Sequence, residues 1–545
     1  MSAAADHSGA DPDRVRDAVA RRCGGQAVTV HETHISWVFV AGDRAFKLKK
    51  PLVLDFLDYG TVARRREMCE EEVRLNARLA PDLYLGARAL VERADVLEIS
   101  DDEDAAAVDY VVEMRRYDGG ATLAALADAG RITSDHVNAV GVRLARFHAG
   151  CTVARQERGS LTVRHEVQEN LSELTDVCTD RAAVARVGAL GRLLTAWMAA
   201  HEQLLDARGR DGHFRAVHGD LRAEHVLVGP PVRVVDCVEF NEELRTLDVA
   251  DDLAFLVMDL CARGARARAE ELVAAYRGAG GDCGPDELLW FFAVHRALIR
   301  AKVALVRSRQ TGAEEGDQGL LAVGERCAWR SRGALALLVC GVPASGKSHL
   351  ARALAARTGC PVISSDVVRK ELAGLAAHER APEGLYTPEA DTRTYHALGR
   401  RAAAEVQTGH GVLVDATFRR RADRDAFARA WRDTAPLLFA QCMAPGSELR
   451  RRAGDRDADP GRISDADAGI VERERDSFEP LEEADPGRHL ILRTDREVSE
   501  VVGDLLALLD ARLMPAPGVS SRRPGAERPE GSSGPLARDP RPCRP

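Results

Sequence analysis

The sequence predicts a multidomain protein in which an α+β part is followed by an α/β part, and three observations support this class. The chain has 545 residues, more than one hydrophobic core usually serves. Near the N-terminus, short β-prone runs follow one another across tight turns, which favours an antiparallel sheet. Beyond Arg330, β-prone and helical segments alternate, which predicts a parallel sheet with helices on both faces.

The composition is that of a folded globular protein, with 45% hydrophobic and 30% charged residues. A formal net charge of -9 argues against a strongly basic nucleic-acid surface over the whole molecule. The 12 cysteines show no CxxC pair and no zinc-site spacing, which fits a reducing cytoplasm. The N-terminus lacks the pattern of a secretion signal, and the apolar run 334–340 is too short to span a bilayer. We therefore expect a soluble, cytoplasmic protein without a membrane anchor.

The α+β part begins with a predicted β-meander. Its β-prone runs are 28–34, 37–40 and 45–48, with a turn at Gly42-Asp43 before the last run. An amphipathic helix is predicted over 62–79, where apolar residues recur at helical spacing.

Short strands are predicted around 85–91 and 109–114, before a mostly helical region over 121–205. Two β-prone pieces follow, and helical sequence then runs from Val249 to about Arg307.

The α/β part alternates strands with helices. The predicted strands are 335–340, 362–365 and 412–415, and the predicted helices are 348–358 and 393–408. The tail after about Met514 is rich in Pro, Gly, Ser and Arg, which predicts disorder.

A phosphate-binding motif lies between the first strand and the first helix of this part. The eight residues that match G-x-x-x-x-G-K-[ST] in full are Gly341, Val342, Pro343, Ala344, Ser345, Gly346, Lys347 and Ser348. In such a loop, backbone N–H groups surround the phosphates and the lysine reaches the outer ones. The motif therefore predicts ATP bound with Mg²⁺, and the Ser348 hydroxyl is a predicted magnesium ligand.

Two carboxylates follow neighbouring strands of the same predicted sheet. Asp415 ends the third strand, where it could hold magnesium, although a turn or N-cap role is the alternative. Asp366 follows the second strand and could take a proton from an acceptor hydroxyl. An N-cap role for Asp366 is about as well supported by the pattern, and both roles can coexist.

Arginines recur near these segments. Arg452 and Arg456 are spaced by one helical turn and could cover the transferring phosphoryl group, with a solvated basic face as the alternative. Arg419, Arg420 and Arg421 follow the Asp415 strand and could contact an anionic acceptor.

These segments resemble the P-loop kinase family that includes phage polynucleotide kinase, the zeta toxins and chloramphenicol phosphotransferase. The resemblance covers roughly 335–509 and rests on GVPASGKS, on VISSDVVRK and on VLVDATFRRRADR. It implies that Asp366 acts as general base or substrate anchor and that Arg369 binds the substrate. It also implies phosphoryl transfer to a hydroxyl, without choosing among nucleic-acid ends, nucleotide sugars and small drugs.

A second constellation lies upstream, in HGDLRAEHVLV (218–228) and VVDCVEF (234–240). An aspartate in a short loop and another at a strand end suit base-plus-magnesium chemistry. The arrangement resembles the aminoglycoside phosphotransferase family, a branch of the protein-kinase fold, over roughly 28–307. The resemblance implies that Asp220 is the catalytic base and that Asp236 is the main magnesium ligand.

The same resemblance implies that Lys47 pairs with the ATP phosphates and with a helix glutamate, which we place at Glu71. Lys49 lies on the same strand face and Glu72 adjoins Glu71, so these neighbours stay open as alternatives. The resemblance also implies that Asp252 braces the fold.

Two departures from that family stand out. His225 occupies the usual place of a magnesium-binding asparagine, and a loop histidine without a ligand role is its simpler interpretation. The segment 32–36 is bulky where the family has a glycine-rich loop over the phosphates.

The domain prediction follows from these resemblances. We expect a flexible N-terminus over 1–25, a protein-kinase-like two-lobe domain over 26–330 and a P-loop domain over 333–512. The first domain divides into lobes near 115, and 513–545 form the disordered tail.

Together these features predict an ATP-dependent phosphotransferase for a hydroxyl of a small molecule or nucleotide-like acceptor, with ATP bound by the P-loop domain. The alternative is an ATP-binding switch whose N-terminal domain is a degenerate ligand-binding module. The net charge argues against a nucleic-acid acceptor, whereas the resemblance to polynucleotide kinase argues for one. The sequence sets no oligomeric state.

Overall fold

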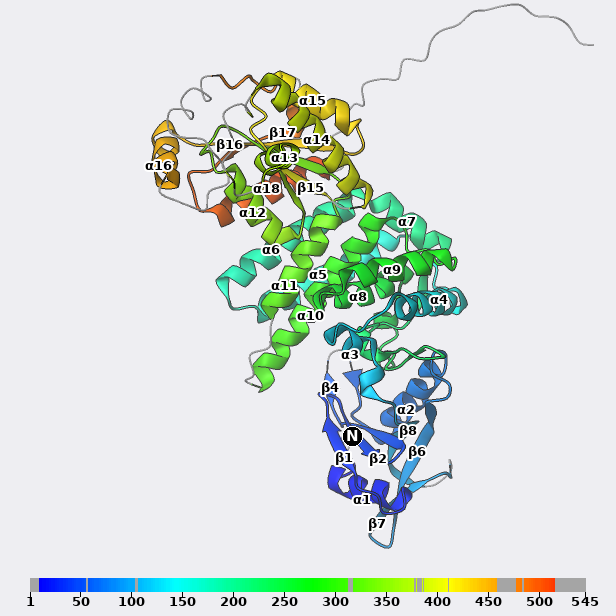
Figure 1. Cartoon of the computed structure of the whole chain (residues 1–545). Coiled ribbons are helices and arrows are strands. Elements are labelled where there is room, and N and C mark those ends of the chain that lie inside the picture. Colours follow the sequence, from blue (N-terminus) through cyan, green and yellow to red (C-terminus); the bar gives the residue numbers. More distant parts are fainter. Residues whose placement is uncertain are drawn as a thin grey trace, which may run out of the picture.

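The computed structural model shows three parts in a row, with a sheet lobe at one end, a helical lobe in the middle and a second sheet domain at the other end (Figure 1). It describes residues 9–54, 57–102, 106–311, 317–376, 379, 385, 387–409, 411–457, 477–482 and 485–514. No helix among these residues combines the length and apolar composition needed to cross a bilayer.

The N-lobe is built on a six-stranded antiparallel sheet, in the order β1-β2-β3-β8-β6-β7. The strands are β1 (Thr29–Glu32), β2 (Ser36–Ala41), β3 (Arg44–Lys49), β6 (Tyr84–Arg93), β7 (Val96–Ser100) and β8 (Ala107–Arg115), beside the small pair β4 (Val53–Leu54) and β5 (Leu57–Asp58). The predicted meander is therefore confirmed. Helix α2 (Val62–Asn76) begins where the Thr61 side chain accepts a hydrogen bond from Arg64 N, and it packs against β6 and β8.

The prediction of a flexible N-terminus over 1–25 is wrong for part of that range. Helix α1 (Pro12–Arg22) is capped by Asp11, whose side chain accepts from Asp13 N. Its apolar face is buried, with Val15 and Val19 fully inaccessible to solvent in the same core as Phe39. Docking of this face on the sheet orders the helix; residues 1–8 lie outside the described range.

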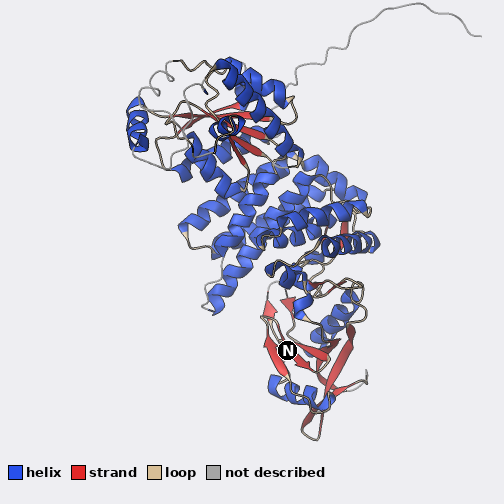
Figure 2. Ribbon diagram, in the orientation of Figure 1, coloured by secondary structure: helices blue, strands red, loops and turns tan. Residues whose placement is uncertain are grey.

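The C-lobe is mostly helical (Figure 2). Its helices are α3 (Leu123–Asp128), α4 (Ser134–Gly150), α5 (Gly159–Val177), α6 (Arg181–Ala200), α7 (Glu202–Asp211), α8 (Val249–Ala262), α9 (Arg266–Gly278), α10 (Asp286–Thr311) and α11 (Asp317–Arg330). Its short strands are β9 (Phe214–Ala216), β10 (Val226–Leu227), β11 (Arg233–Val234) and β12 (Thr246–Asp248). The segments between these strands carry Asp220, His225 and Asp236 of the N-terminal candidate site.

The C-terminal domain contains a five-stranded parallel sheet in the order β14-β15-β13-β16-β17. The strands are β13 (Ala336–Cys340), β14 (Val362–Ser364), β15 (Val412–Asp415), β16 (Leu437–Met443) and β17 (His489–Arg493). The helices are α12 (Lys347–Thr358), α13 (Ser365–Leu372), α14 (Pro388–Gln407), α15 (Arg421–Trp431), α16 (Gly446–Asp457) and α18 (Val498–Leu513). The predicted tail falls almost wholly on 515–545, outside the described residues.

Successive residues of β13 point to opposite faces of this sheet, and each face has its own core. Leu337 and Val339 pack with residues of α12 and α18, whereas Leu338 packs with residues of α14 and α15. Helices therefore cover both faces, as predicted.

The C-lobe and the P-loop domain are joined through α11. Cys327 belongs to the C-lobe core, whereas Trp329 belongs to a core of the P-loop domain. The carboxylate of Glu325 accepts from Arg186 of α6 at 2.8 Å and from Arg357 of α12 at 2.9 Å. The expected domain boundary near residue 330 therefore falls at the end of a helix that packs against both domains, and not in an exposed linker.

Candidate functional sites

The phosphate-binding loop connects β13 to α12 at the carboxyl end of the sheet. Its backbone turns through positive φ at Gly341 (135°), Ala344 (63°) and Gly346 (92°). A Cβ at Gly341 would lie 2.5 Å from the Cys442 carbonyl oxygen of β16, so this position requires glycine. Strand β13 lies in the middle of the sheet, between β15 and β16. In open α/β sheets, ligands bind beyond the carboxyl ends of such inner strands, where the strand order reverses.

The polar groups of the loop fit an anion. Lys347 begins α12, and its ammonium group donates to Val342 O at 2.9 Å within the loop. The hydroxyl of Ser345 is buried without a hydrogen-bond partner. The Thr494 hydroxyl donates to Ser345 O at 2.6 Å and so ties the loop to the end of β17. An ammonium group, a buried hydroxyl and a helix N-terminus together form a suitable site for phosphate.

The two predicted carboxylates lie near this lysine. Asp415 is the buried last residue of β15 and is in register with Ser364 of β14. Asp366 lies in the first turn of α13, whose N-cap is Ser364, so the N-cap role weighed for Asp366 is wrong. Burial, and then the charge of Asp415, raises the pKa of Asp366 above its ordinary value, while Lys347 acts in the opposite direction.

Arg452 of α16 reaches the phosphate-binding loop. It donates to Glu448 at 2.7 Å and to Thr494 O at 2.6 Å. A Cβ at Gly346 would lie 3.2 Å from its Nη1 atom. The side chain of Arg456, on the same helix, lies outside the described residues.

The predicted acceptor arginines divide into two places. Arg369 of α13 donates to Asp391 of α14 at 2.7 Å, and Arg420 donates to the other oxygen of Asp391 at 3.3 Å. Arg419 instead donates to Ser477 Oγ at 2.6 Å. The backbone N–H of Arg421 donates to Glu479 at 2.5 Å, and the Arg421 side chain forms no ion pair or hydrogen bond with a residue that the structure describes.

Sequence reasoning missed two carboxylates here. Asp391 holds Arg369 and Arg420 together, and nothing in its sequence context marks it out from other helix aspartates. Burial, and then the charge of Asp391, raises the pKa of Asp423 to about 6.

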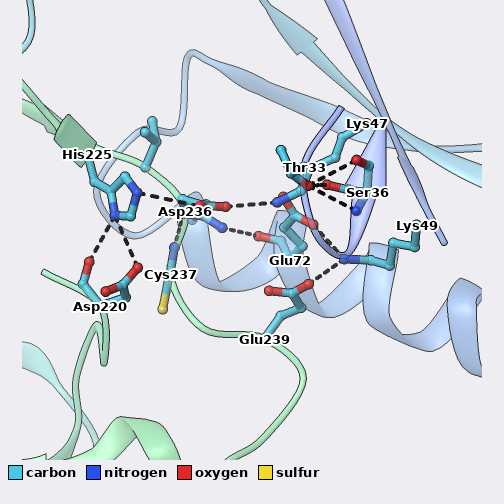
Figure 3. Close-up of polar contacts among 12 residues, drawn as sticks. Thr33, Ser36, Lys47, Lys49, Glu72, Asp220, His225, Asp236, Cys237 and Glu239 are labelled. Atoms are coloured by element: carbon cyan, nitrogen blue, oxygen red, sulfur yellow. Dashed lines mark hydrogen bonds and ion pairs between the residues drawn. The ribbon is translucent and has the colours of Figure 1, made fainter. Parts of the chain in front are cut away.

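The N-terminal candidate site lies where the N-lobe meets the C-lobe (Figure 3). Lys47 of β3 donates to Glu72 at 3.0 Å and to Asp236 at 2.8 Å. The predicted partner, Glu71, is therefore wrong. Glu71 pairs with Arg74 at 2.7 Å and Arg245 at 3.0 Å, because successive helix residues point about 100° apart and α2 turns Glu72 towards β3.

Lys49 shares the same glutamate. It donates to Glu72 Oε2 at 2.7 Å and forms an ion pair with Glu239, which also accepts from Tyr59 at 2.5 Å. Burial alone would lower the pKa of Lys49, but Glu239 and Glu72 together raise it well above its ordinary value. Lys49 is thus a structural cation, whereas Lys47 faces Asp236.

Asp236 is held in a special conformation. Its backbone has a φ of 64°, which lies in the left-handed region that residues other than glycine rarely adopt. The charge of Lys47 holds the pKa of Asp236 well below its ordinary value. The carboxylate is therefore ionised and oriented at the edge between the lobes.

The carboxylate of Asp220 is paired with an arginine that sequence reasoning did not single out. Arg222 donates to its two oxygens at 2.8 Å and 2.9 Å. Although burial opposes ionisation, Arg222 and His225 lower the pKa of Asp220 below its ordinary value. The sequence HGDLR contains both residues and could have suggested this pair, because an aspartate two residues before an arginine in a short loop can form an ion pair with it.

His225 lies between the two aspartates of this site. Its Nδ1 is 2.9 Å from Asp220 O, and its Nε2 is 3.6 Å from Asp236 Oδ2. Buried Asp252 accepts from Gly219 N at 2.8 Å and lies 3.0 Å from His148 Nε2, so it braces the loop that carries Asp220, as predicted.

The bulky segment over the site is a closed turn between β1 and β2. The Thr33 hydroxyl accepts from Ser36 N at 3.0 Å and lies 2.9 Å from Ser36 O. Side-chain bonds therefore hold a turn that the resembling family builds with glycines.

Within the described ranges, no group of three or more His, Cys, Asp and Glu side chains is placed to hold a metal ion. Mg²⁺ is usually bound through one or two carboxylates together with substrate phosphates and water. The oxygen donors Ser348 and Asp415, and separately Asp236, fit that pattern.

Comparison with known proteins agrees with the two-part architecture. The model of the phosphotransferase enzyme family matches residues 41–289, and that of the AAA domain matches residues 337–481. Uncharacterized proteins of Mycobacterium tuberculosis and Mycobacterium bovis are 33% identical over 457 residues, which cover 82% of this chain and 89% of each relative.

Two solved structures are similar to separate parts of the chain. A gluconokinase from Sinorhizobium meliloti is 24% identical, covers 34% of this chain and 94% of its own, and gives a TM-score of 0.25. A choline/ethanolamine kinase family protein from Mesorhizobium loti is 15% identical, covers 58% of this chain and 93% of its own, and gives a TM-score of 0.35.

Proposed function

Because this chain belongs to the family of its mycobacterial relatives and joins a phosphotransferase domain to an AAA domain, we propose that it is an ATP-dependent phosphotransferase. The γ-phosphoryl group would pass to a hydroxyl of a small molecule or nucleotide-like acceptor. The P-loop domain would bind the ATP. Our proposal for the class of acceptor is based on the site residues alone.

One observation carries the proposal: Lys347, Asp366 and Asp415 meet at the carboxyl edge of one parallel sheet. Lys347 and the loop amides would bind the outer phosphates, and Ser348 and Asp415 would hold Mg²⁺. When bound, magnesium would neutralise charge on the phosphates. Asp366 would accept the proton of the attacking hydroxyl, since its raised pKa brings it closer to that of a useful base.

The arginines would act on either side of this centre. Arg452 reaches the phosphate-binding loop and would stabilise negative charge during transfer. Arg369 and Arg420, held in place by Asp391, would bind and orient the acceptor.

A second candidate function is an ATP-binding switch in which the N-terminal domain senses a ligand without catalysing transfer. The observation in its favour is that Arg222 occupies both oxygens of Asp220. A carboxylate so engaged, with a lowered pKa, is a weak proton acceptor.

Turnover measurements on the full chain separate these candidates. A screen would supply ATP, Mg²⁺ and hydroxyl compounds, and detect acceptors by mass spectrometry as products that gain one phosphate. The proposal expects ADP release that depends on acceptor and is lost in Lys347→Ala but kept in Asp220→Ala. Loss in Asp220→Ala alone would move the chemistry to the N-terminal site, and indifference to both variants would remove the kinase proposal.

A further inference from the structure

A small cavity lies at the seam between the C-lobe and the P-loop domain, away from both candidate sites. Its volume is about 110 Å³. The C-lobe contributes Arg266 at the start of α9, with Arg326 and Arg330 from α11. The P-loop domain contributes Thr358 and Gly359, where α12 ends.

The charges around the cavity are unequally compensated. Arg330 forms an ion pair with Glu270 at 2.9 Å and lies 4.5 Å from the centre of the Trp290 ring, so its position is fixed. The side chains of Arg266, which is exposed, and of Arg326, which is half-buried, form no ion pair or hydrogen bond with any described residue. Glu405 also acts on this region and offsets part of the positive charge. Arg266 and Arg326 together still outweigh it.

These arginines could instead have a structural role as hydrogen-bond donors to the last carbonyl groups of α12. The hydrogen bonds at the end of that helix do not support this role. The carbonyl of Leu354 accepts from the Thr358 hydroxyl at 2.7 Å, and that of Ala355 accepts from Gly359 N at 2.7 Å. Neither Arg266 nor Arg326 donates to a described carbonyl. Their guanidinium donors therefore remain available.

A buried donor in the cavity wall adds a second observation. Trp329 lines the cavity, is 2% exposed, and its indole N–H has no hydrogen-bond partner of acceptable geometry. The Cys360 sulfur, which is only a weak acceptor, lies close to this N–H group, and its own thiol donates to Gly411 O at 3.0 Å. Buried donors without partners are rare, and a bound acceptor would satisfy this one.

We propose that this cavity binds a phosphate dianion, either free or as the terminal group of a phosphomonoester, and thereby ties the C-lobe to α12. At about 30 Å³ for each water molecule, the cavity has the space of roughly four waters, which is comparable with one phosphate group. Guanidinium groups match the oxygens of phosphate through paired N–H donors. Helix α12 is roughly 18 Å long, so this site is separate from the phosphate loop at its other end.

The test must remove phosphate binding at the P-loop itself, so the full-length Lys347→Ala variant is the starting protein. Inorganic phosphate, glucose 6-phosphate and chloride at equal ionic strength are titrated while thermal unfolding and heat of binding are measured. Saturable stabilisation by phosphate or by the phosphomonoester is expected. Adding Arg326→Gln should weaken that affinity by roughly tenfold, because a charge-assisted pair is lost. The matched control is Arg268→Gln, whose side chain on α9 pairs with Glu271 instead, and it should change nothing.

The two ligands identify the source of the phosphate group. Stabilisation by both shows that the free ion suffices, and stabilisation by glucose 6-phosphate alone assigns the site to phosphomonoesters; either result supports the proposal. It is overturned if neither ligand stabilises the Lys347→Ala chain, or if binding is the same in Arg326→Gln. Because catalysis at the P-loop is already disabled, this outcome is independent of the proposed function.

Discussion

At the scale of single residues, the backbone of the phosphate-binding loop restricts which side chains it accepts. Gly341 combines a φ of 135° with a neighbouring carbonyl that leaves no room for a Cβ. Lys347, which follows the loop at the start of α12, depends on the loop for its position.

The substitution Gly341→Ala should therefore reduce both stability and nucleotide binding. We expect a loss of about 2 kcal/mol in the free energy of unfolding, because the new methyl group meets backbone in a strained conformation. Urea unfolding and calorimetry with Mg·ATP measure the two effects. The control is Gly503→Ala in α18, where a Cβ meets nothing within 4 Å and the change should be neutral or stabilising. Equal behaviour of the two variants would contradict the strained-loop account.

The raised pKa of Asp366 predicts the pH dependence of turnover. A proton acceptor must be ionised, and a raised pKa keeps this carboxyl protonated to higher pH than an ordinary aspartate. The value of kcat/KM should therefore fall as pH drops, starting above the usual range of carboxylates. Asp366→Asn should lower kcat by about 10²–10⁴-fold while leaving ATP binding in place. An unchanged acidic limb in that variant would assign the titration to another group.

At the scale of elements, α2 connects the N-lobe sheet to its candidate site through two buried contacts. Glu72 faces both lysines of β3, and Arg65 forms a fully buried pair with Asp109 of β8 at 2.8 Å. Asp109 also accepts from Ala10 N at 3.0 Å, next to α1. The pair thus holds α2, β8 and the N-terminal segment together.

Removing one charge of this pair should destabilise the N-lobe. Asp109→Asn leaves Arg65 as an uncompensated buried cation, for which we expect a cost of about 3–5 kcal/mol in the free energy of unfolding. Asp128→Asn is the control, because Asp128 pairs with Arg263 at the surface and should cost under about 1 kcal/mol. Urea denaturation followed by circular dichroism compares them. Similar midpoints for both variants would contradict the structural role of the buried pair.

The elements that the sequence predicts well are those with regular periodicity. The meander and the alternating strands and helices after residue 330 follow from alternation and helical spacing. Helix α1 was missed because its sequence is mostly charged and only one narrow face is buried by the sheet. Glu71 and Glu72 are equal in sequence, and only the rotation of α2 against β3 distinguishes them. Contacts between distant segments, such as Asp391 with Arg420, leave no pattern in a single sequence.

At the scale of the whole molecule, α11 packs against both the C-lobe and the P-loop domain and so joins them. It contributes residues to the cores of both, and Glu325 joins Arg186 of the C-lobe to Arg357 of the P-loop helix. The candidate sites nevertheless lie in separate parts of the chain (Figure 1).

Loss of this ionic junction should weaken the connection between the domains. Glu325→Gln leaves two arginines without their shared carboxylate, and we expect a cost of about 3 kcal/mol. In scanning calorimetry, the unfolding of the P-loop domain should move to lower temperature and separate from that of the C-lobe. Glu173→Gln removes an exposed pair with Lys302 and serves as the control. A single unshifted transition would show that apolar packing alone joins the domains.

The central claim is that the loop before α12 binds the phosphates of a nucleotide. Calorimetric titration of Mg·ATP into the full chain, Lys47→Ala and Lys347→Ala tests it most directly. The account predicts that binding heat persists in Lys47→Ala, and that the corresponding component disappears in Lys347→Ala. Undiminished heat in Lys347→Ala, together with its loss in Lys47→Ala, would place the nucleotide in the N-terminal domain and contradict the account.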